Sequence, residues 1–372
     1  MTKELFPSLQ SAYPWTNTPV IVGAPMRLIS TAPLAVAVSL AGGIGFIGAG
    51  SDLSALPEHL SNVASILSTT PLSSDVLPVG VGVITHAVSL PNLLSAIEPN
   101  KLNRPPPCAI WLFAPEKPED LKEWSDEIRA ISPMTKIWIQ AGSVSEALQS
   151  TLSAHPDVLV LQGSDAGGHG LSQNASIVPL IPECMDALQL LVSSGQLDAM
   201  PHIVAAGGIA EGRGAAAALA LGADAICLGT RLLASSEANI SKGYQDEVLR
   251  ASDGGLTTVR SRVYDKLRGT NHWPERFDGR GVVNGSYEDW KEGRMTEQKN
   301  IQMYEEALQK GDAGWGLQGR LTTYAGTAVG LVKEAAPAAR IIREVREDCR
   351  ATVHALSEKV KFHQASLYSI SS

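Results

Sequence analysis

The first 230 residues of this 372-residue chain contain eight short apolar runs, and these runs constrain its fold more than any other feature. Each run has the length of a β-strand and is bounded by Gly, Pro, Ser or Asp, and successive runs start roughly 20 to 45 residues apart. Most are continuously apolar instead of alternating, which is typical of parallel strands covered on both faces. The predicted strands are Val20–Ala24, Ile44–Gly48, Val79–Val83, Ala109–Phe113, Lys136–Gln140, Val158–Gln162, Ile203–Ala206 and Ala225–Gly229.

Stretches with helical patterns lie between most of these strands. They are Leu34–Ala41, Leu56–Ser68, Val88–Ala96, Leu121–Ile131, Ser143–Ser153, Ile181–Val192 and Arg213–Leu221. Eight strand–helix units within about 210 residues predict an α/β fold, a (β/α)₈ TIM barrel. A doubly wound open sheet is the alternative. It usually needs fewer strands, and no Gly-x-Gly-x-x-Gly turn follows the first strand here.

Charge is distributed unevenly along the chain. Residues 1–235 contain 10 Lys and Arg and 19 Asp and Glu, whereas the shorter stretch 236–372 contains 20 and 19. A charge-poor stretch rich in Ala, Gly, Val, Ile and Leu indicates a large buried core. We therefore expect the barrel in residues 1–235, a smaller, mostly helical flanking domain near the active site in 236–330, and a C-terminal helix in 331–372 that packs back on the barrel.

Two segments of the flanking region lack a helical pattern, and the first, Leu256–Tyr264, has alternating Thr, Val and Arg. Residues 268–285 are rich in Gly, Asn, Pro and Trp and are predicted to form a loop. Three tryptophans of the region, Trp273, Trp290 and Trp315, could close the active site or form a subunit contact. The second reading would make the protein a homodimer.

The bulk properties exclude several classes of partner. The formal net charge is −8 and no basic run occurs, which argues against nucleic acid. No segment reaches the roughly 18 uninterrupted apolar residues that a membrane-spanning helix needs. Residues 1–7 lack the pattern of a secretory signal, and residues 368–372 lack a lipidation or peroxisomal signal. We therefore expect a cytoplasmic protein that works away from the membrane.

The cysteines support the same expectation. Cys108, Cys184, Cys227 and Cys349 are far apart and form no Cys-x-x-Cys pair. A zinc site or redox dithiol built on such a pair is therefore not expected, and we predict no metal. Four lone thiols fit a reducing, intracellular compartment.

Glycines follow the last two predicted strands at the places where barrels hold phosphate. Gly207-Gly208 follows the seventh strand and Gly229-Thr230 follows the eighth. Active sites of barrels lie at the carboxyl ends of the strands, and the loops after strands seven and eight often bind phosphate. Glycine lets backbone N–H groups approach an anion, and helix N-termini add positive potential. A mononucleotide cofactor is the natural occupant, although these glycines could serve only to make tight turns.

One histidine lies in a loop that suits proton transfer. His169 follows Gly167-Gly168 after the sixth strand, so we expect an exposed ring on a flexible backbone. An unperturbed imidazole changes charge near neutral pH, which suits a general acid or base. The alternative is an ordinary surface histidine. His86, after the third strand, is the reserve candidate, and Asp165 is expected to bond the backbone of its own loop.

Two further strand ends carry side chains that suit a flat heterocycle. Gln162 ends the sixth strand and offers both a donor and an acceptor to a ring edge. Met26 follows Pro25 after the first strand and offers a polarizable thioether to a ring face. Methionine is more often a core residue, but Pro25 at a strand end favours a fixed, exposed turn.

Together these segments resemble the nitronate monooxygenase family, formerly called 2-nitropropane dioxygenase. The matching motifs are Val22–Met26, Ala41–Gly48, Leu161–Gly170, Ala206–Asp224 and Gly229–Arg231. The resemblance covers residues 20–235 closely and extends more loosely into Thr257–Gly285 and Tyr324–Gly330. Five motifs in this order are specific for an FMN-dependent barrel superfamily and less specific for one activity within it.

The resemblance implies a flavoprotein that binds FMN and uses O₂ to oxidise alkyl nitronates to a carbonyl compound and nitrite. Nitroalkanes are a second substrate class that it allows. It implies a catalytic role for His169, as a base or as a group that orients the substrate. Ten positions are implied to bind the cofactor. Ala24, Pro25 and Met26 line the flavin, Gln162 and Gly167 contact its ring or ribityl region, Gly168 is a further cofactor-binding position, and Gly207, Gly208, Gly229 and Thr230 hold its phosphate.

One position departs from the family pattern. Many members have Asn after the third strand in a Gly-Val-Asn pattern, whereas this chain has Gly80-Val81-Gly82. One flavin hydrogen bond is then lost or supplied elsewhere. An NAD(P)H-dependent flavin reductase acting on quinones or an enoyl thioester remains the alternative enzyme. A barrel that binds a phosphate ligand without catalysis is a third hypothesis.

Overall fold

The computed structural model describes residues 8–70, 75–98, 104–316 and 318–360. Eight parallel strands form a closed barrel in the order β1-β2-β3-β4-β5-β6-β8-β9, and β9 pairs with β1 to complete the ring. The predicted TIM barrel is therefore confirmed. The strands are β1 (Val20–Gly23), β2 (Ile44–Gly50), β3 (Leu77–Ile84), β4 (Pro107–Phe113), β5 (Lys136–Ala141), β6 (Val158–Gln162), β8 (His202–Ala206) and β9 (Ala225–Leu228).

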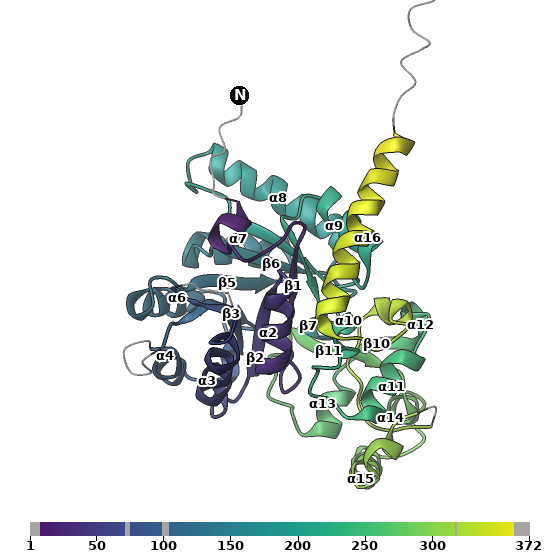
Figure 1. Ribbon diagram of the computed structural model, residues 1–372. Helices are drawn as coiled ribbons and strands as arrows, with labels where there is room; N and C mark the ends of the chain where they lie inside the picture. The colour runs from purple at the N-terminus through teal and green to yellow at the C-terminus, as the bar shows by residue number, and fades with distance from the viewer. Residues whose placement is uncertain (1–7, 71–74, 99–103, 317, 361–372) are drawn as a thin grey trace, which may run out of the picture.

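Helices surround the barrel, as Figure 1 shows. They are α2 (Ala32–Leu40), α3 (Leu56–Leu67), α4 (Leu90–Ile97), α6 (Asp120–Ile131), α7 (Val144–Ala154), α8 (Ile177–Ser193), α9 (Gly212–Ala220) and the short α10 (Thr230–Leu233). Alternate residues of one strand belong to two different cores: Ile137 and Ile139 of β5 pack outward among residues of the helices, whereas Trp138 packs inside the barrel. Burial on both faces explains why the strands read as continuous apolar runs.

Large aromatic side chains fill the barrel interior. Trp138 of β5 stacks on Trp111 of β4 with ring centroids 5.7 Å apart, and Phe46 of β2 packs 4.9 Å from Trp138. The indole N–H of Trp138 donates a 2.7 Å hydrogen bond to the hydroxyl of Tyr13, which follows α1 (Leu9–Ala12). The barrel is therefore a packed core, and the space for a ligand lies at the carboxyl ends of its strands.

A second, antiparallel sheet joins the flank to the barrel. Its strand order is β10-β11-β7, with β10 at Thr258–Ser261, β11 at Phe277–Val282 and β7 at Gly168–Leu171. The prediction of a loop is wrong at both β7 and β11. Neither strand has an alternating apolar pattern, and each acquires its conformation by pairing with a partner distant in the sequence, His169 lying opposite Gly279.

Among its described residues the flank contains five further α-helices, which gather on one side of the barrel in Figure 1, and two short 3-10 helices, η2 (Gly311–Gly314) and η3 (Thr327–Leu331). The α-helices are α11 (Lys242–Arg250), α12 (Gly254–Thr257), α13 (Val263–Arg268), α14 (Gly285–Lys291) and α15 (Glu297–Leu308). A small core that includes Tyr264, Tyr304 and Leu321 holds this unit together. The flank is rich in helix, and the three-stranded sheet connects it to the barrel.

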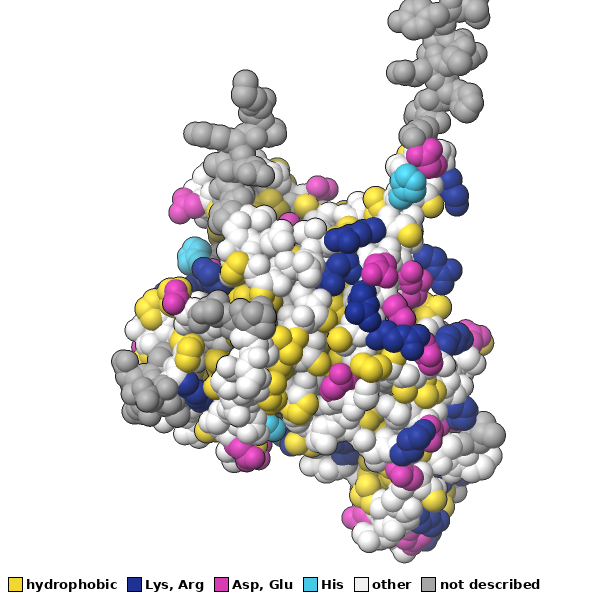
Figure 2. All heavy atoms as spheres, viewed as in Figure 1, with side chains coloured by type: hydrophobic (Ala, Val, Ile, Leu, Met, Phe, Trp, Pro, Cys, Tyr) yellow, Lys and Arg dark blue, Asp and Glu magenta, His cyan; other side chains and the backbone are white. Residues whose placement is uncertain are grey.

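The C-terminal helix α16 (Ala338–Lys359) packs on α9 and α2 and then extends beyond the barrel (Figure 1). Its buried Arg346 donates hydrogen bonds to the carbonyls of Ala41 (3.0 Å) and Gly42 (2.8 Å), in the turn between α2 and β2. On the face in Figure 2, charged side chains gather along this helix, where Arg340 pairs with Glu344.

Within the ranges that the structure describes, no helix is long and apolar enough to cross a membrane. All four cysteines are free and buried. The segments 1–7 and 368–372, on which the expectation about targeting signals was based, lie outside the described residues.

We expect the substitution Arg346→Met to lower the free energy of unfolding by about 2–3 kcal/mol, because it leaves buried carbonyls without their charged donor. Chemical denaturation followed by circular dichroism measures this change. Arg343→Met, on the exposed side of the same helix, is the matched control and should change stability little. Equal effects of the two substitutions would show that the Arg346 contacts do not stabilise the fold.

Candidate active site

Four neighbouring strands of the barrel end at a common rim. Three pairings, β6 with β8, β8 with β9 and β9 with β1, place their carboxyl ends side by side. The predicted cofactor residues lie at these ends: Ala24, Pro25 and Met26 after β1, Gln162 at the end of β6, Gly207 and Gly208 after β8, and Gly229 and Thr230 after β9. The fold therefore brings residues as distant in sequence as Ala24 and Thr230 to one mouth.

The loops after β8 and β9 present unpaired backbone donors. Gly207 and Gly208 have φ values of 102° and 76°, in the region that favours glycine. In the described part of the chain, no protein acceptor receives the N–H groups of Gly207, Gly208, Gly229 or Thr230. Successive free N–H groups that face one space form an anion-binding concavity. These loops could therefore hold the oxygens of a phosphate.

The N-terminus of α9 adds less to this concavity than the sequence suggested. The Glu211 carboxylate caps this helix by accepting a 3.1 Å hydrogen bond from the N–H of Gly214. A Cβ on Gly212, the first residue of α9, would lie 2.3 Å from the Cβ of Asp348 on α16. The donors available to an anion are therefore those of the Gly207-Gly208 and Gly229-Thr230 loops.

One segment of the flank, residues 325–327, lies across the mouth and touches two of its loops; we call it the crossing segment. The N–H of Gly326 donates to the hydroxyl oxygen of Thr230 over 2.9 Å. Thr327 donates through its N–H to the carbonyl of Asp165 (3.0 Å) and through its hydroxyl to the Asp165 carboxylate (2.8 Å). Asp165 was expected to bond the backbone of its own loop; its carboxylate instead fixes this crossing segment.

The two glycines before His169 differ in their surroundings. A Cβ on Gly167 would lie 2.4 Å from the carbonyl carbon of Ala325, so the crossing segment occupies the space beside Gly167. A Cβ on Gly168 would meet no atom within 4 Å. Gly168 therefore faces open space, whereas Gly167 is required for packing within the protein.

Gln162 connects the barrel to β7. The side-chain amide of Gln162 donates a 3.1 Å hydrogen bond to the backbone carbonyl of His169. The backbone carbonyl of Gln162 accepts a 2.9 Å hydrogen bond from the side-chain amide of Asn174. A Cβ on Gly170 would lie 2.4 Å from the side-chain oxygen of Gln162. The amide of Gln162 is thus fixed at the rim and supports the backbone that carries His169.

The ring of His169 is enclosed, contrary to the exposed ring that the sequence suggested. Only 13% of its side chain is accessible. Its Nε2 lies 2.9 Å from Oδ1 of Asp265, and its ring stacks on Trp273 with centroids 3.8 Å apart and an interplanar angle of 8°. Tyr324 packs against the ring at 5.3 Å. The flank supplies all three neighbours.

Sequence reasoning missed Asp265 and Tyr324 and named Trp273 only as part of an apolar cover. Asp265 is one of many carboxylates in the charge-rich flank, and no motif distinguishes it. The signals available were the looser resemblance over Thr257–Gly285 and Tyr324–Gly330 and the tryptophan in an irregular segment. Their meaning depends on the pairing of β7 with β11, which no local pattern predicts.

His86, the reserve candidate, also packs against Trp273. The two rings are 4.9 Å apart, and His86 Nδ1 lies 2.9 Å from the carbonyl of Ala114. Burial lowers the pKa of His86 below its ordinary value, because desolvation disfavours the charged ring. Its Nε2 is buried without a hydrogen-bond partner. His86 is thus a half-buried polar group beside the site, in surroundings that disfavour its charged form.

Pro25 explains the departure at Gly82. A Cβ on Gly82 would lie 2.2 Å from the Cβ of Pro25. An asparagine cannot occupy this position unless the turn after β1 moves, because the proline ring already fills the space. Glycine at position 82 of β3 therefore leaves the space that the ring of Pro25 occupies.

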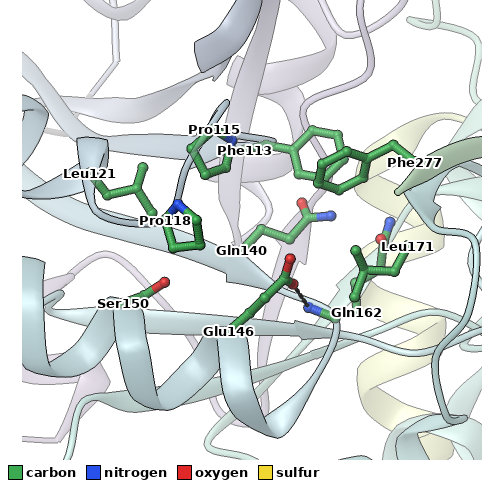
Figure 3. A pocket seen from close by; sticks show the side chains of 11 residues that line it. Phe113, Pro115, Pro118, Leu121, Gln140, Glu146, Ser150, Gln162, Leu171 and Phe277 are labelled. Atoms are coloured by element: carbon green, nitrogen blue, oxygen red, sulfur yellow. Dashed lines mark hydrogen bonds between the residues drawn. The ribbon is translucent and has the colours of Figure 1, made fainter. Parts of the chain in front are cut away.

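A small cavity opens beside Gln162 (Figure 3). Phe113, Gln140, Leu171 and Phe277 line it together with Glu146 of α7. Burial raises the pKa of Glu146, whose carboxylate accepts a 3.0 Å hydrogen bond from the N–H of Gly142. Apolar and polar side chains both line this cavity, which lies next to the rim.

The residues that the structure describes contain no group of three or more His, Cys, Asp or Glu that could hold a metal ion. The groups that the structure brings together here are the unpaired N–H donors of the glycine loops and a histidine held by a carboxylate. Among the described residues, no lysine or arginine forms an ion pair with the carboxylate of Asp265. His169 is the basic side chain in contact with it.

Comparisons with known proteins assign the chain to a family. A family model described as nitronate monooxygenase matches residues 101–348. Nitronate monooxygenase npaC of Metarhizium robertsii is 46% identical over 351 residues, which cover 92% of this chain and 94% of that protein. A nitronate monooxygenase of Neurospora crassa is 37% identical over 364 residues, covering 93% of each chain.

A solved structure supports the fold. A FabK mutant from Thermotoga maritima matches with a TM-score of 0.70 and 24% identity, over 94% of this chain and 98% of that one. At this identity the likeness concerns the architecture alone. The matches over nearly the whole length of two relatives carry the assignment: this chain belongs to the nitronate monooxygenase family and is a flavin-dependent monooxygenase.

Proposed function

We propose that this enzyme binds FMN at the barrel mouth and uses O₂ to oxidise alkyl nitronates to a carbonyl compound and nitrite. The observation that carries the proposal is the pairing of an anion-binding concavity with an enclosed histidine at one mouth. The concavity is formed by the unpaired N–H groups after β8 and β9, and the histidine is His169 on β7. Family membership makes nitronates the expected substrates.

The residues present fit a flavin mononucleotide. Gly207, Gly208, Gly229 and Thr230 would receive the phosphate, because their N–H groups lack protein acceptors. The turn after β1 would lie along the ring, with Met26 partly accessible at the rim. Bound FMN would supply the redox chemistry by accepting electrons from the substrate and passing them to O₂.

The protein's own contribution is binding, orientation and proton transfer. A nitronate is already an anion, so its oxidation requires no base. A neutral nitroalkane must first lose the proton from the carbon that carries the nitro group. His169, held at the mouth between Trp273 and Tyr324, is the group we assign to that step. A nitronate is therefore the simpler substrate, and the turnover of a nitroalkane depends on His169.

The test of this function is oxygen consumption by the purified flavoprotein with ethylnitronate or propionate 3-nitronate, together with measurement of nitrite. We expect oxygen uptake and nitrite release with at least one of them. A yellow protein without oxygen uptake would contradict the proposal. A reductase that uses NAD(P)H on quinones or an enoyl thioester is not favoured by the relatives, and oxidation of NADPH by the protein is the corresponding control.

We expect His169→Asn to retain flavin, because the glycine loops are separate from β7. Turnover of nitroethane should fall by about 10²-fold or more, the usual contribution of a positioned general base. Steady-state oxygen uptake and the flavin-to-protein absorbance ratio measure the two effects. Unchanged nitroethane turnover would remove His169 from the mechanism.

We expect Gly208→Asp to abolish retention of FMN. A side chain at this positive φ is strained, its Cβ would lie 3.1 Å from that of Asp165, and its carboxylate would repel a phosphate. The flavin content after purification measures the effect. Gly195→Asp is the matched control, because Gly195 also has positive φ (72°) but faces open space on the loop after α8. Full flavin content in Gly208→Asp would place the phosphate elsewhere.

A further inference from the structure

The two ring nitrogens of His169 have different surroundings. Nε2 faces Oδ1 of Asp265 at 2.9 Å. Nδ1 has no hydrogen-bond partner in the described part of the protein and is not enclosed by it. One nitrogen is therefore committed to the protein, and the other is available to a ligand.

Asp265 is built to accept a proton-bearing nitrogen. Its side chain is 1% accessible, and its Oδ1 receives the hydroxyl of Thr270 (2.9 Å) as well as His169 Nε2. The hydroxyl of Tyr324 approaches the same oxygen at 3.4 Å. Several hydrogen-bond donors that point to one oxygen suit a carboxylate, because an ionised carboxylate accepts hydrogen bonds and donates none. The nitrogen that faces Asp265 must then carry the hydrogen.

Packing prevents the ring from exchanging its two nitrogens. Trp273 covers one face of the His169 ring in parallel, and Tyr324 packs against the ring at an interplanar angle of 57°. The backbone carbonyl of Trp273 accepts a 2.8 Å hydrogen bond from Arg262, which fixes the backbone that carries the indole. Opposite His169 on β11, Gly279 has no side chain, and a Cβ there would lie 3.5 Å from Nε2. The ring is thus fixed in a narrow slot.

We infer that Asp265 is a positioning residue that holds His169 as the Nε2–H tautomer, so that Nδ1 presents its lone pair to the substrate. The inference rests on the proposed function. In the step it describes, the C–H bond beside the nitro group breaks, the proton moves to Nδ1, and the electron pair stays on the substrate as the nitronate. The buried carboxylate then stabilises the imidazolium, as in hydrolases that pair histidine with aspartate.

Other polar groups around the ring do not compete for Nδ1. Besides Asp265 of α13, the titratable groups facing the ring are the hydroxyl of Tyr324 and, beside Trp273, His86. Arg268 lies behind Tyr324, with its guanidinium 5.5 Å from that ring centroid. His86 is committed through Nδ1 to the carbonyl of Ala114. Asp265 is therefore the group that sets the tautomer.

The kinetic test compares two substrates of the flavin-loaded Asp265→Asn variant. We expect kcat/KM for nitroethane to fall by about 10²-fold or more, because the base presents the wrong nitrogen. Ethylnitronate needs no proton removed, so its kcat/KM should stay within about threefold. Equal losses for both substrates would indicate a structural role, and an unchanged nitroethane rate, or no nitroethane turnover by the wild type, would overturn the inference.

The tautomer itself is measured by NMR of the ¹⁵N-histidine-labelled, flavin-loaded protein at alkaline pH, with His169→Gln to assign the signal. We expect Nε2–H in the wild type and loss of this preference in Asp265→Asn. Asp289→Asn is the matched control, since Asp289 is a buried, ion-paired aspartate of the same flank that contacts Arg294 and Arg320 instead. Nδ1–H in the wild type would overturn the inference.

The two readouts separate this inference from the proposed function. If the protein fails to oxidise nitronates but shows the Nε2–H tautomer, the proposed function fails and the Asp265–His169 pair stands. If nitronates are oxidised but the tautomer is Nδ1–H, the function stands and the role of Asp265 fails.

Discussion

The pairing of β7 with β11 is the interaction on which the site depends. β7 follows directly from the end of barrel strand β6, whereas β11 belongs to the flank. Their pairing brings Asp265 to His169 although the two residues are 96 positions apart in sequence. It also places Trp273 over the imidazole. Without this pairing His169 would lie on a solvated glycine loop, with neither a fixed tautomer nor a shielded ring.

The site divides into two parts with different origins. The barrel loops after β8 and β9 supply the unpaired N–H groups to which we assign the phosphate, and the flank supplies the surroundings of the histidine. The crossing segment joins the parts, since Gly326 bonds Thr230 while Thr327 bonds Asp165. If the phosphate and the proton transfer lie where we propose, mutations in one part should leave the function of the other part intact.

The sequence predicts the barrel because each strand is buried on both faces, which leaves a local signal. It also predicts that the glycines after β8 and β9 lie at the mouth, because the carboxyl ends of parallel strands form the mouth. It does not predict β7 or β11, since a strand such as Gly168–Leu171 is defined by its partner and not by its own pattern. Asp265 is invisible for the same reason, and the fit of Gly82 against Pro25 appears only in three dimensions.

The central claim is that a flavin at this mouth takes electrons from a nitronate. Its most direct test is an anaerobic titration of the purified protein with ethylnitronate, followed by the visible absorbance of the flavin. The account predicts that ethylnitronate bleaches the flavin and that admitting O₂ restores it, whereas NADPH leaves it oxidised. Bleaching by NADPH, with a flavin that ethylnitronate leaves unchanged, would contradict the account.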